Sequence, residues 1–250
     1  DAEFPIINGE KGNVSVVTRF AGTQGGSLKL LSFTAGQRPN MVPGVAKATV
    51  ETADADALVA AMQAYLDAET RVKGEATVDG NQVAVTFYGK QVHGAMPETG
   101  ENAGTYLANF LQDQDFGGNA QGFLTFLGTK LHDDTVAEKI GAKKHDELMH
   151  DLSMNVGIQR FTDGQDGFVN TNFRYPQNTT ADAIEKHVAQ SLPVGFDAVA
   201  KQEGHAQVPH YVPGNDPLVQ TLLQVYREHT GLPADEQVIG GGTFGRLLKR

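Results

Sequence analysis

The sequence has 250 residues, enough for one large domain or two smaller ones. Hydrophobic residues make up 40% of it, so a sizeable core can form, and the formal net charge of −10 argues against a nucleic-acid partner. The absence of cysteine excludes disulfides and thiolate metal sites, and no apolar run approaches the ~18 residues of a membrane span, so we expect no membrane partner.

The first part of the chain is predicted to form strands around one amphipathic helix. In chain order we expect strands over residues 14–20, 27–35 and 45–52, a helix over 53–74, and a hairpin over 76–89 that turns at Asp79-Gly80. Leu58 and Met62 recur at helical spacing in the helix. Asp54 or Asp56 can cap its start, and Gly74 is predicted to end it.

A loop that contains a histidine follows the hairpin. The segment from Tyr88 to Ala103 reads YGKQVHGAMPETGENA, and the apolar helical pattern YLANFL comes next. Gly94 permits a turn of the backbone and Pro97 restricts it, so the loop can present His93 with little freedom. The position alone also fits a solvent-facing loop histidine.

The second part of the chain repeats some of this order. We expect a mostly helical stretch over 122–141, a hairpin-like pair over 153–176, a helix over 179–192 capped near Thr179 or Thr180, a strand over 196–204, a helix over 215–231, and a short strand that runs into a glycine loop over 236–245. His132, Asp133 and Asp134 are interpreted as the solvated start of a helix. The partial repeat predicts an α+β fold with two ferredoxin-like halves, each a sheet covered by helices.

The eight histidines do not form a recognisable metal motif. HExxH is absent, and His145 and His150 lie five residues apart, so they do not share a helix face as an i, i+4 pair would. His205 and His210 have the same spacing. We interpret all four as structural or surface residues.

Four other positions are candidates for ligand binding. Arg174 lies in NTNFRYP on the same strand face as Asn172, and arginine can bind a carboxylate through two parallel hydrogen bonds, although an exposed strand arginine is the simpler interpretation. Asn40 alone is a turn asparagine, and Asp1 alone is a chain-end acid. GGGTFG at 240–245 matches the dinucleotide pattern GxGxxG, but it also fits an anion-binding turn or a plain tight turn.

Taken together, these segments resemble one family. DAEFPIINGEKG, YGKQVHGAMPETGENA, NTNFRYP and VIGGGTFGRL occur here in the order found in PepV-type dipeptidases. Those enzymes belong to the co-catalytic zinc peptidase superfamily, which also includes aminoacylases, carnosine-type dipeptidases and tripeptidases. The resemblance covers essentially the whole chain.

The resemblance implies how the chain is divided. The family fold is a zinc-bearing α/β catalytic domain interrupted by a lid domain. Residues 1–10 and 207–250 would be short pieces of the catalytic domain, and residues 11–206 would be the lid. Within the lid, two similar halves would cover about 11–112 and 150–206, with a helical insert between them.

It also implies roles for single residues. His93 matches the lid histidine that polarises the scissile carbonyl, and Arg174 matches the lid arginine that holds the substrate's free carboxylate. Asp1 matches a carboxylate ligand of one zinc, and Asn40 matches a lid asparagine close to the substrate. The glycine-rich loop that lines the pocket is matched by Gly241, Gly242 and Thr243.

Other parts of the family's active site are expected outside this chain. The family has an H-x-D motif and an adjacent Glu-Glu pair before the matched segment, and one more metal-binding histidine after it. Both ends of the chain read like the interior of a protein, so we expect an internal fragment. The general base and most zinc ligands would then be missing, and the fragment alone is expected to be inactive.

The implied function is a zinc-dependent dipeptidase that acts on short peptides with a free C-terminal carboxylate. The parent enzyme would use two zinc ions, with manganese or cobalt as alternative metals, and would be a cytoplasmic monomer. Its partners would be a dipeptide substrate and the missing catalytic-domain segments. The alternatives are an N-acyl-amino-acid deacylase or a carnosine-type dipeptidase on the same scaffold, and a non-catalytic dimerisation or binding module, in which His93 and Arg174 need share no cleft.

Overall fold

Residues 4–243 are described by the computed structural model, and they include an eight-stranded antiparallel sheet, hereafter the large sheet. Its spatial order is β5–β6–β4–β3–β7–β8–β2–β9. In chain order the strands are β2 (Gly12–Phe20), β3 (Lys29–Ala35), β4 (Val45–Glu51), β5 (Lys73–Asp79), β6 (Gln82–Tyr88), β7 (Ser153–Thr162), β8 (Gly167–Tyr175) and β9 (Ala198–Gln207).

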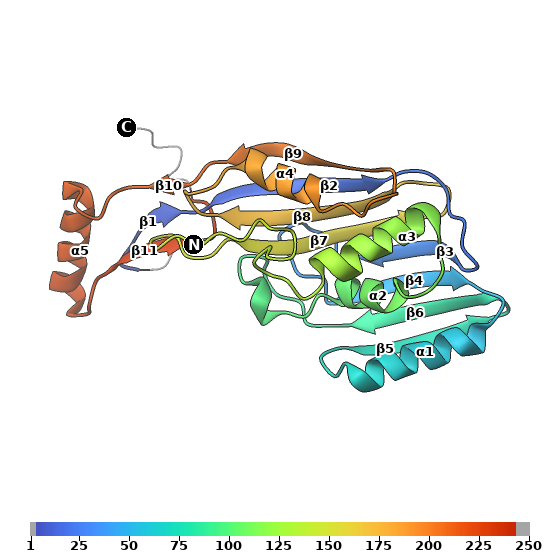
Figure 1. Cartoon of the computed structure of the whole chain (residues 1–250). Coiled ribbons are helices and arrows are strands. Elements are labelled where there is room, and N and C mark those ends of the chain that lie inside the picture. Colours follow the sequence, from blue (N-terminus) through green and yellow to red (C-terminus); the bar gives the residue numbers. More distant parts are fainter. Residues whose placement is uncertain (1–3, 244–250) are drawn as a thin grey trace.

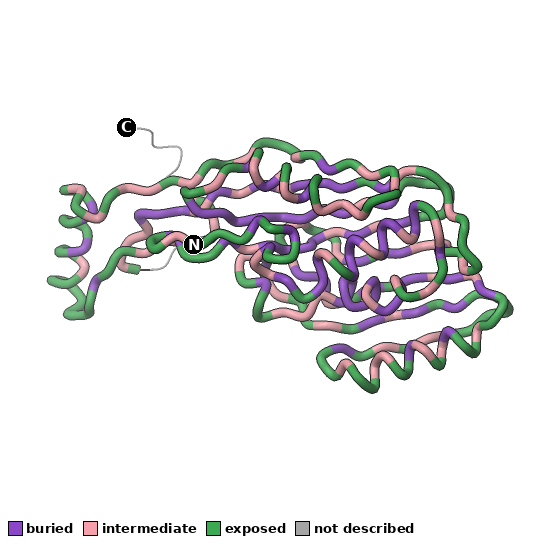
Figure 2. The backbone as a smooth tube through the Cα atoms, in the orientation of Figure 1, coloured by how far each residue is buried: buried purple, intermediate pink, exposed green. Residues whose placement is uncertain are grey.

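Helices cover one face of the large sheet (Figure 1). They are α1 (Ala55–Ala68), α2 (Ala103–Leu111), α3 (Gly118–Thr125) with a π-helical extension η2 (Phe126–Leu131), and α4 (Ala181–Gln190). Alternate strand positions point toward these helices, and among them Phe33, Phe87 and Phe173 are fully buried. Burial of one such side chain stabilises the fold by about 1.5–3 kcal/mol. Because these side chains point toward the helices, the core lies between the helices and the large sheet. Figure 2 shows buried segments in α2 and the central strands, whereas α1 alternates between exposed and half-buried residues and buries only Leu58 and Met62.

A three-stranded sheet, hereafter the small sheet, adjoins one end of the large sheet (Figure 1). Its middle strand β1 is parallel to β11 and antiparallel to β10. The helix α5 packs on β1 through Val219 and Leu223, which form a small core with Ile6. Lys11 alone separates β1 from β2. The bounds are β1 (Ile6–Glu10), β10 (His210–Tyr211), α5 (Pro217–Thr230) and β11 (Glu236–Ile239).

Helix starts follow the local sequence signals. Asp54 caps α1, Thr180 caps α4, and Asp216 caps α5 with Pro217 in the first turn; each cap side chain accepts a hydrogen bond from a main-chain N–H. A side-chain cap of this kind stabilises a helix by about 1 kcal/mol. The predicted caps of α1 and α4 are confirmed, at Asp54 and Thr180.

The predicted end of α1 is wrong. The helix ends at Ala68, and Gly74 lies inside β5 instead. A side-chain carbon placed on Gly74 would lie 2.9 Å from both Leu66 and Phe87. Glycine is therefore present because helix and sheet approach closely there, which the sequence pattern does not distinguish from a helix stop.

The large sheet runs without a break through both predicted lid halves. Its central pair is β3 with β7. Outward from β3 the order is β4, β6, β5, and outward from β7 it is β8, β2, β9, so β2 lies among strands of the other predicted half. The order strand, strand, helix, strand occurs as β3, β4, α1, β5 and as β7, β8, α4, β9. Superposition of the two halves stays a prediction.

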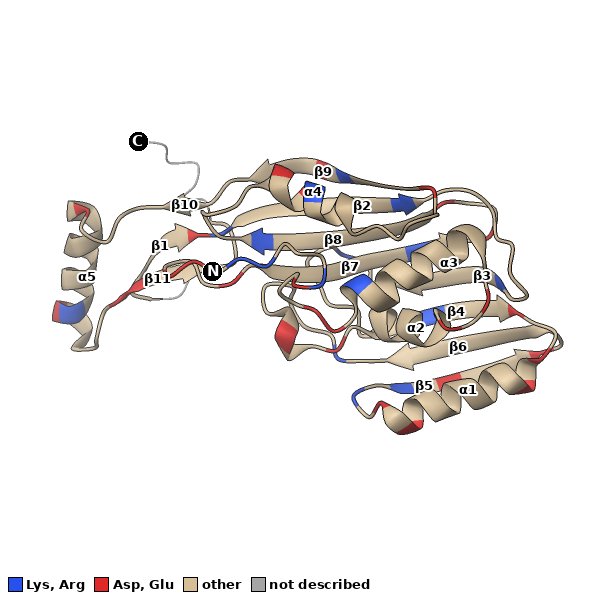
Figure 3. Cartoon of the chain, in the orientation of Figure 1, with Lys and Arg blue, Asp and Glu red and all other residues tan. Residues whose placement is uncertain are grey.

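Basic side chains do not gather on one part of the fold. Figure 3 shows them on elements as far apart as α5, β8, β9 and β5, interspersed with acidic ones. Residues 4–243 contain no helix that is both long and apolar enough to cross a bilayer.

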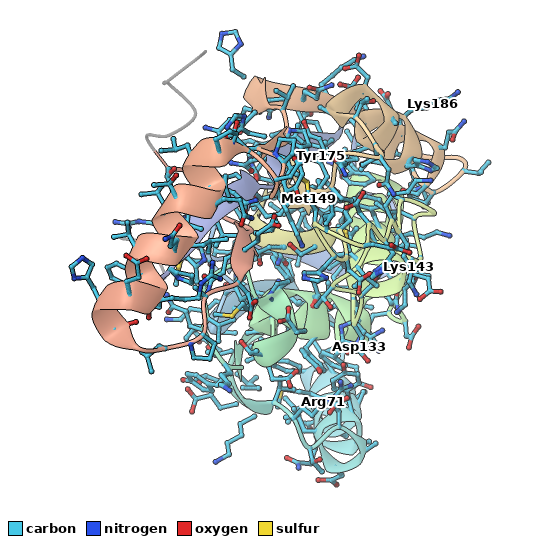
Figure 4. The ribbon with its side chains drawn as sticks, turned by 90° about the vertical axis from the view of Figure 1, so that its left-hand side faces the viewer. Arg71, Asp133, Lys143, Met149, Tyr175 and Lys186 are labelled. Carbon is cyan, nitrogen blue, oxygen red and sulfur yellow. The ribbon has the colours of Figure 1, made fainter. Side chains whose placement is uncertain are left out.

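The segment after α3 also differs from the prediction. His132 follows the last residue of η2 and is only 8% exposed, so its interpretation as the solvated start of a helix is wrong. Its ring meets the Tyr106 ring edge-on, with 4.5 Å between the centroids. Arg71 lies over the Tyr106 ring and forms ion pairs of 2.8 Å with Glu69 and 2.9 Å with Asp133. Arg71 and Asp133 are labelled in Figure 4. Together they tie the start of β5 to the end of η2.

Burial of His132 gives the fold an expected pH dependence. Burial lowers the pKa of His132 from 6.5 to about 4, a shift worth on the order of 3 kcal/mol at about 1.4 kcal/mol per pKa unit. Between these values the unfolded chain binds more protons than the folded chain, so the free energy of unfolding should fall as the pH falls from 6.5 to 4. Urea unfolding at a series of pH values measures this.

The variant His132→Phe should flatten that slope, because it keeps a ring against Tyr106 and removes the titrating group. The exposed His205 supplies the control, and His205→Gln should leave the slope unchanged. Arg71 lowers the pKa of the Asp133 carboxyl group below 3.8, so protonation of that group affects stability only at pH values below the 4–6.5 window. An unchanged slope in His132→Phe would contradict the assignment.

Candidate active site

A bulge in β7 brings a loop close to the sheet. The register of β7 against β8 shifts at Gly157. A side-chain carbon on Gly157 would lie 2.3 Å from the carbonyl oxygen of Pro39, so only glycine permits this approach. The loop over residues 36–44 carries Asn40, and we call it the Asn40 loop.

Two side chains of β7 hold the Asn40 loop. Asn155 Nδ2 donates hydrogen bonds to the carbonyl oxygens of Pro39, at 2.6 Å, and Met41, at 3.1 Å. Arg160 donates to the carbonyl oxygen of Gly36. Both side chains project from the face of the large sheet that the helices leave uncovered. Their neighbours along β7, Met154 and Phe161, lie in the core on the opposite face. The loop is thus fixed at its start and at its middle.

The loop that carries His93 is closed at its base. We call residues 91–100 the His93 loop. Lys90 and Glu101 exchange two main-chain hydrogen bonds of 2.9 and 3.0 Å, and a short 3-10 helix, η1 (Pro97–Thr99), lies within the loop. Asn102 then caps α2 and donates to the carbonyl oxygen of Val156 at 2.9 Å. Helix α2 starts at Ala103 and is anchored on the bulged strand β7.

The two loops pair with each other. The Gly94 N–H donates to the carbonyl oxygen of Asn40 at 2.8 Å, and the Val42 N–H donates to that of Val92 at 2.9 Å. A side-chain carbon on Gly94 would lie 2.8 Å from Asn155 Nδ2. One asparagine of β7 therefore contacts both loops.

His93 itself is exposed at the surface of this pair of loops. Its Nδ1 accepts a hydrogen bond from the Ala95 N–H at 3.2 Å. In the neutral imidazole the ring proton must then lie on Nε2, which makes Nε2 the hydrogen-bond donor. The local fold thus fixes the tautomer in which His93 can donate to an oxygen of a ligand.

Arg174 lies one strand away, on the same face of the sheet as Asn155. On β8 it pairs with Asn13 of β2 on one side and with Ser153 of β7 on the other, and it is 8% exposed. Asn155 pairs with Asn172, so Arg174 and Asn155 are diagonal neighbours, a relation that places residues about 7–8 Å apart. The predicted facing of Arg174 with Asn172 is confirmed.

The glycine loop after β11 reaches the same region. Thr243 donates hydrogen bonds from its N–H, at 2.9 Å, and from its hydroxyl to Glu10 Oε1, and Glu10 is only 3% exposed. A side-chain carbon on Gly240 would lie 3.7 Å from Cβ of Ala95 in the His93 loop. Gly241 and Gly242 lie between these two contacts, so the loop borders the His93 loop.

A lysine at the junction of the two sheets adds positive charge beside the site. Lys11 Nζ donates to the carbonyl oxygen of Asp151 at 2.5 Å. Burial lowers the pKa of Lys11, while the carboxylates of Asp151 and of Glu98, in the His93 loop, act in the opposite direction. Lys11 therefore lies among carboxylates at the end of the large sheet that also carries Arg174.

A groove of about 460 Å³ runs along the Asn40 loop and gives a small molecule room beside the two loops. Its floor and walls are formed by nine residues of the two loops and the start of β4: Gly36, Gln37, Arg38, Met41, Val42, Pro43, Gly44, Val45 and Gln91. Gln91 is the single residue of the His93 loop among them, so the groove belongs to the Asn40 loop and is not lined by His93 or Arg174.

The described residues do not fit a zinc site. Asp1, the predicted ligand, lies outside the described residues, and within 4–243 no group of three or more His, Asp or Glu side chains could hold a metal ion. His132, Asp133 and Asp134 form an H-x-D triplet, but His132 is buried against Tyr106 and Asp133 is paired with Arg71. No chemical step can be assigned to a metal held by these residues.

The structure brings together the predicted residues His93, Asn40 and Arg174 and the glycine loop at the end of the large sheet next to the small sheet (Figure 1). Sequence analysis missed the residues that hold this arrangement, above all Asn155 and Arg160. The only signal for Asn155 is that it alternates with apolar neighbours in SMNVG, which places it off the core face. Its contact with residues more than 100 positions earlier has no local signature.

No protein-family model matches the chain. The chain is 37% identical to the Beta-Ala-Xaa dipeptidase of Lactobacillus delbrueckii subsp. lactis over 251 residues, which cover 100% of this chain and 53% of that protein. It is 38% identical over 260 residues to a protein of Staphylococcus haemolyticus that is provisionally named a dipeptidase, again with 100% of this chain and 54% of the relative covered.

Among solved structures, the aminoacylhistidine dipeptidase of Vibrio alginolyticus matches with a TM-score of 0.46 and 13% identity, over 95% of this chain and 52% of that one. The chain spans about half the length of the curated relatives. The predicted resemblance to dipeptidases is confirmed, and the chain is related to these proteins along its whole length.

Proposed function

We propose that this chain supplies the substrate-binding and carbonyl-polarising groups of a metal-dependent dipeptidase that uses two zinc ions. The observation that carries the proposal is the meeting of four segments, distant in sequence, at one end of the large sheet. The Asn40 loop, the His93 loop, the end of β8 and the glycine loop all contact one another or share β7 as support. The relatives' names support the reaction class, and the full-length parent would be a cytoplasmic monomer.

The roles follow from the chemistry of the two side chains. Arg174 offers a planar guanidinium at the end of the sheet, suited to the two oxygens of a free C-terminal carboxylate. His93 offers an Nε2–H that can donate to the scissile carbonyl oxygen, and this bond strengthens as negative charge develops there. Arg174 would bind the C-terminal carboxylate, and His93 would donate to the scissile carbonyl oxygen. These two substrate groups are close together only in very short peptides, so the arrangement favours such substrates.

Two other functions make different use of the same groups. A deacylase for N-acyl-amino acids, or a carnosine-type dipeptidase, would use Arg174 in the same way but accept a different amino end. A non-catalytic binding module would need no common surface for His93 and Arg174. The contact of Gly94 with Asn155, the diagonal neighbour of Arg174, argues against that module.

A substrate panel on the full-length parent tests the proposal. Dipeptides, tripeptides and N-acyl-amino acids would be compared by kcat/KM, with zinc content measured in parallel. We expect kcat/KM to be about tenfold or more higher for dipeptides than for the other substrates. One well-placed hydrogen bond to a charged group of the substrate can give this ratio. A preference for N-acyl-amino acids would establish the deacylase, and no hydrolysis of any would reject the enzyme.

The present chain alone should neither hydrolyse dipeptides nor bind a zinc pair. A catalytic zinc takes three protein ligands, and the described residues offer no such group. Isothermal calorimetry with zinc chloride measures this. Tight, stoichiometric binding of two zinc ions by the 250-residue chain would contradict the prediction.

A further inference from the structure

Asn155 differs from the other buried amides of the large sheet in what it contacts. Asn155, Asn170 and Asn172 all lie on the face that the helices leave uncovered and are at most 5% exposed. Asn170 donates to Glu203 at 2.8 Å, and Asn172 donates to Asn13 at 2.8 Å, so both bonds stay within the strands. Asn155 alone among these three donates to a loop.

The orientation of the Asn155 amide is fixed by its partners. Nδ2 meets two main-chain carbonyl oxygens, of Pro39 and Met41, which can only accept hydrogen bonds. Its Oδ1 is buried and has no hydrogen-bond partner among residues 4–243. Because a buried acceptor left unpaired is unfavourable, the two bonds that Nδ2 makes must offset it, which argues that they matter for this sequence.

Those two bonds join the parts of the site that come from different elements. Pro39 and Met41 flank Asn40, so the Asn155 amide binds the loop on both sides of this predicted substrate-binding residue. The same amide is the surface on which Gly94, next to His93, rests. On the sheet, Asn155 is the diagonal neighbour of Arg174.

We propose that Asn155 is a positioning residue that sets His93 and Asn40 at a fixed distance from Arg174. The catalytic part of this inference rests on the proposed function, whereas the structural part concerns the chain alone. Asn155 is only 2% exposed, and its side chain donates to the main chain of the Asn40 loop. It acts through the main chain of the two loops, by preventing the paired loops from lifting off β7.

The structural part is tested by hydrogen exchange on the 250-residue chain. In Asn155→Ala, the amide hydrogens of Val42 and Gly94, which bond between the two loops, should exchange about tenfold faster, the ratio expected when a hydrogen bond of ordinary net strength is lost. The matched control is Asn170→Ala, which removes an equally buried amide from the same face and leaves the loops alone. Equal exchange rates for these amides in the two variants would overturn the inference.

A second variant separates hydrogen bonding from packing. Asn155→Asp keeps the shape of the side chain but replaces the donor with an oxygen that faces two carbonyl oxygens. If the hydrogen bonds position the loops, Asn155→Asp should exchange at least as fast as Asn155→Ala at neutral pH. Wild-type protection in Asn155→Asp would mean that Asn155 only fills space, and the proposal would fail.

The catalytic part is tested on the full-length parent with a dipeptide. Asn155→Ala should lower kcat about tenfold or more and change KM by less than about threefold, because misplacement of a carbonyl donor affects the transition state while the strand that carries Arg174 stays intact. Asn170→Ala should retain both constants at a similar melting temperature. Equal kcat in the two variants would reject the catalytic part. If the parent proves inactive on every peptide, the proposed function fails, and the exchange experiment still decides the role of Asn155.

Discussion

Replacement of His93 by alanine in the full-length parent is expected to lower kcat for a dipeptide by roughly a hundredfold or more, the scale found when one oxyanion donor is removed. The reason is the tautomer that the loop imposes: Ala95 N–H occupies Nδ1, so Nε2 carries the proton that can be donated to the carbonyl oxygen. Because the ring is exposed and supports no core contact, the melting temperature and the zinc content should stay unchanged.

His93→Gln should recover part of the lost activity, since an amide can donate a hydrogen bond but carries no positive charge. The exposed His205, on β9, is the control, and His205→Ala should retain wild-type kinetics. Steady-state kinetics, a metal assay and a melting curve are required together. Turnover of His93→Ala within a few-fold of wild type would show that His93 is an ordinary loop residue.

Replacement of Arg174 should impair substrates with a free C-terminal carboxylate much more than substrates without one. In the full-length parent, Arg174→Ala should reduce kcat/KM for free dipeptides by about 10- to 100-fold relative to amidated analogues, because a hydrogen bond to a charged group contributes about 1.5–3 kcal/mol. Arg174→Lys should not restore the preference, since an ammonium lacks the planar fork that pairs with both carboxylate oxygens.

Arg19 provides a matched control for Arg174. It lies on β2 over the Phe168 ring, away from the two loops, so Arg19→Ala should leave the ratio unchanged. Because Arg174 is mostly buried, a melting curve must accompany the kinetics. Equal losses on free and amidated dipeptides would point to a structural role for Arg174.

Local features of the fold could be predicted from the sequence because local chemistry decides them. Asp54, Thr180 and Asp216 cap helices through their own side chains, and Gly80, with a φ of +59°, lies in the predicted hairpin turn. Each of these decisions involves only a few neighbouring residues. They therefore leave a readable signal in the chain.

Features decided by distant contacts could not be predicted in this way. Gly74 is required by the approach of Leu66 and Phe87, and a glycine in that pattern reads equally well as a helix stop. His132 precedes two acidic residues that suggest solvent, yet it is buried against Tyr106 from another helix. In both cases the decisive atoms lie outside the local window of sequence.

The candidate site shows the same division. His93, Asn40 and Arg174 were found because family motifs mark them, not because position or spacing demanded them. Asn155 carries no motif, and its partners in the Asn40 loop are 116 and 114 residues away in the sequence. Only the fold reveals that this amide connects the segments on which the proposed chemistry depends.

The place of β2 in the large sheet has a consequence for how the chain folds. β2 is synthesised before its neighbours β8 and β9, which begin only at Gly167 and Ala198. Val14 and Val16, buried in the finished sheet, must therefore wait without these partners while the residues between β2 and β8 emerge. Closing so long a stretch of chain is entropically slow, and an unpaired apolar strand can associate with other chains in the meantime. Half of the large sheet is thus completed late, and newly made chains should depend on chaperones that shield β2 until β8 and β9 have formed.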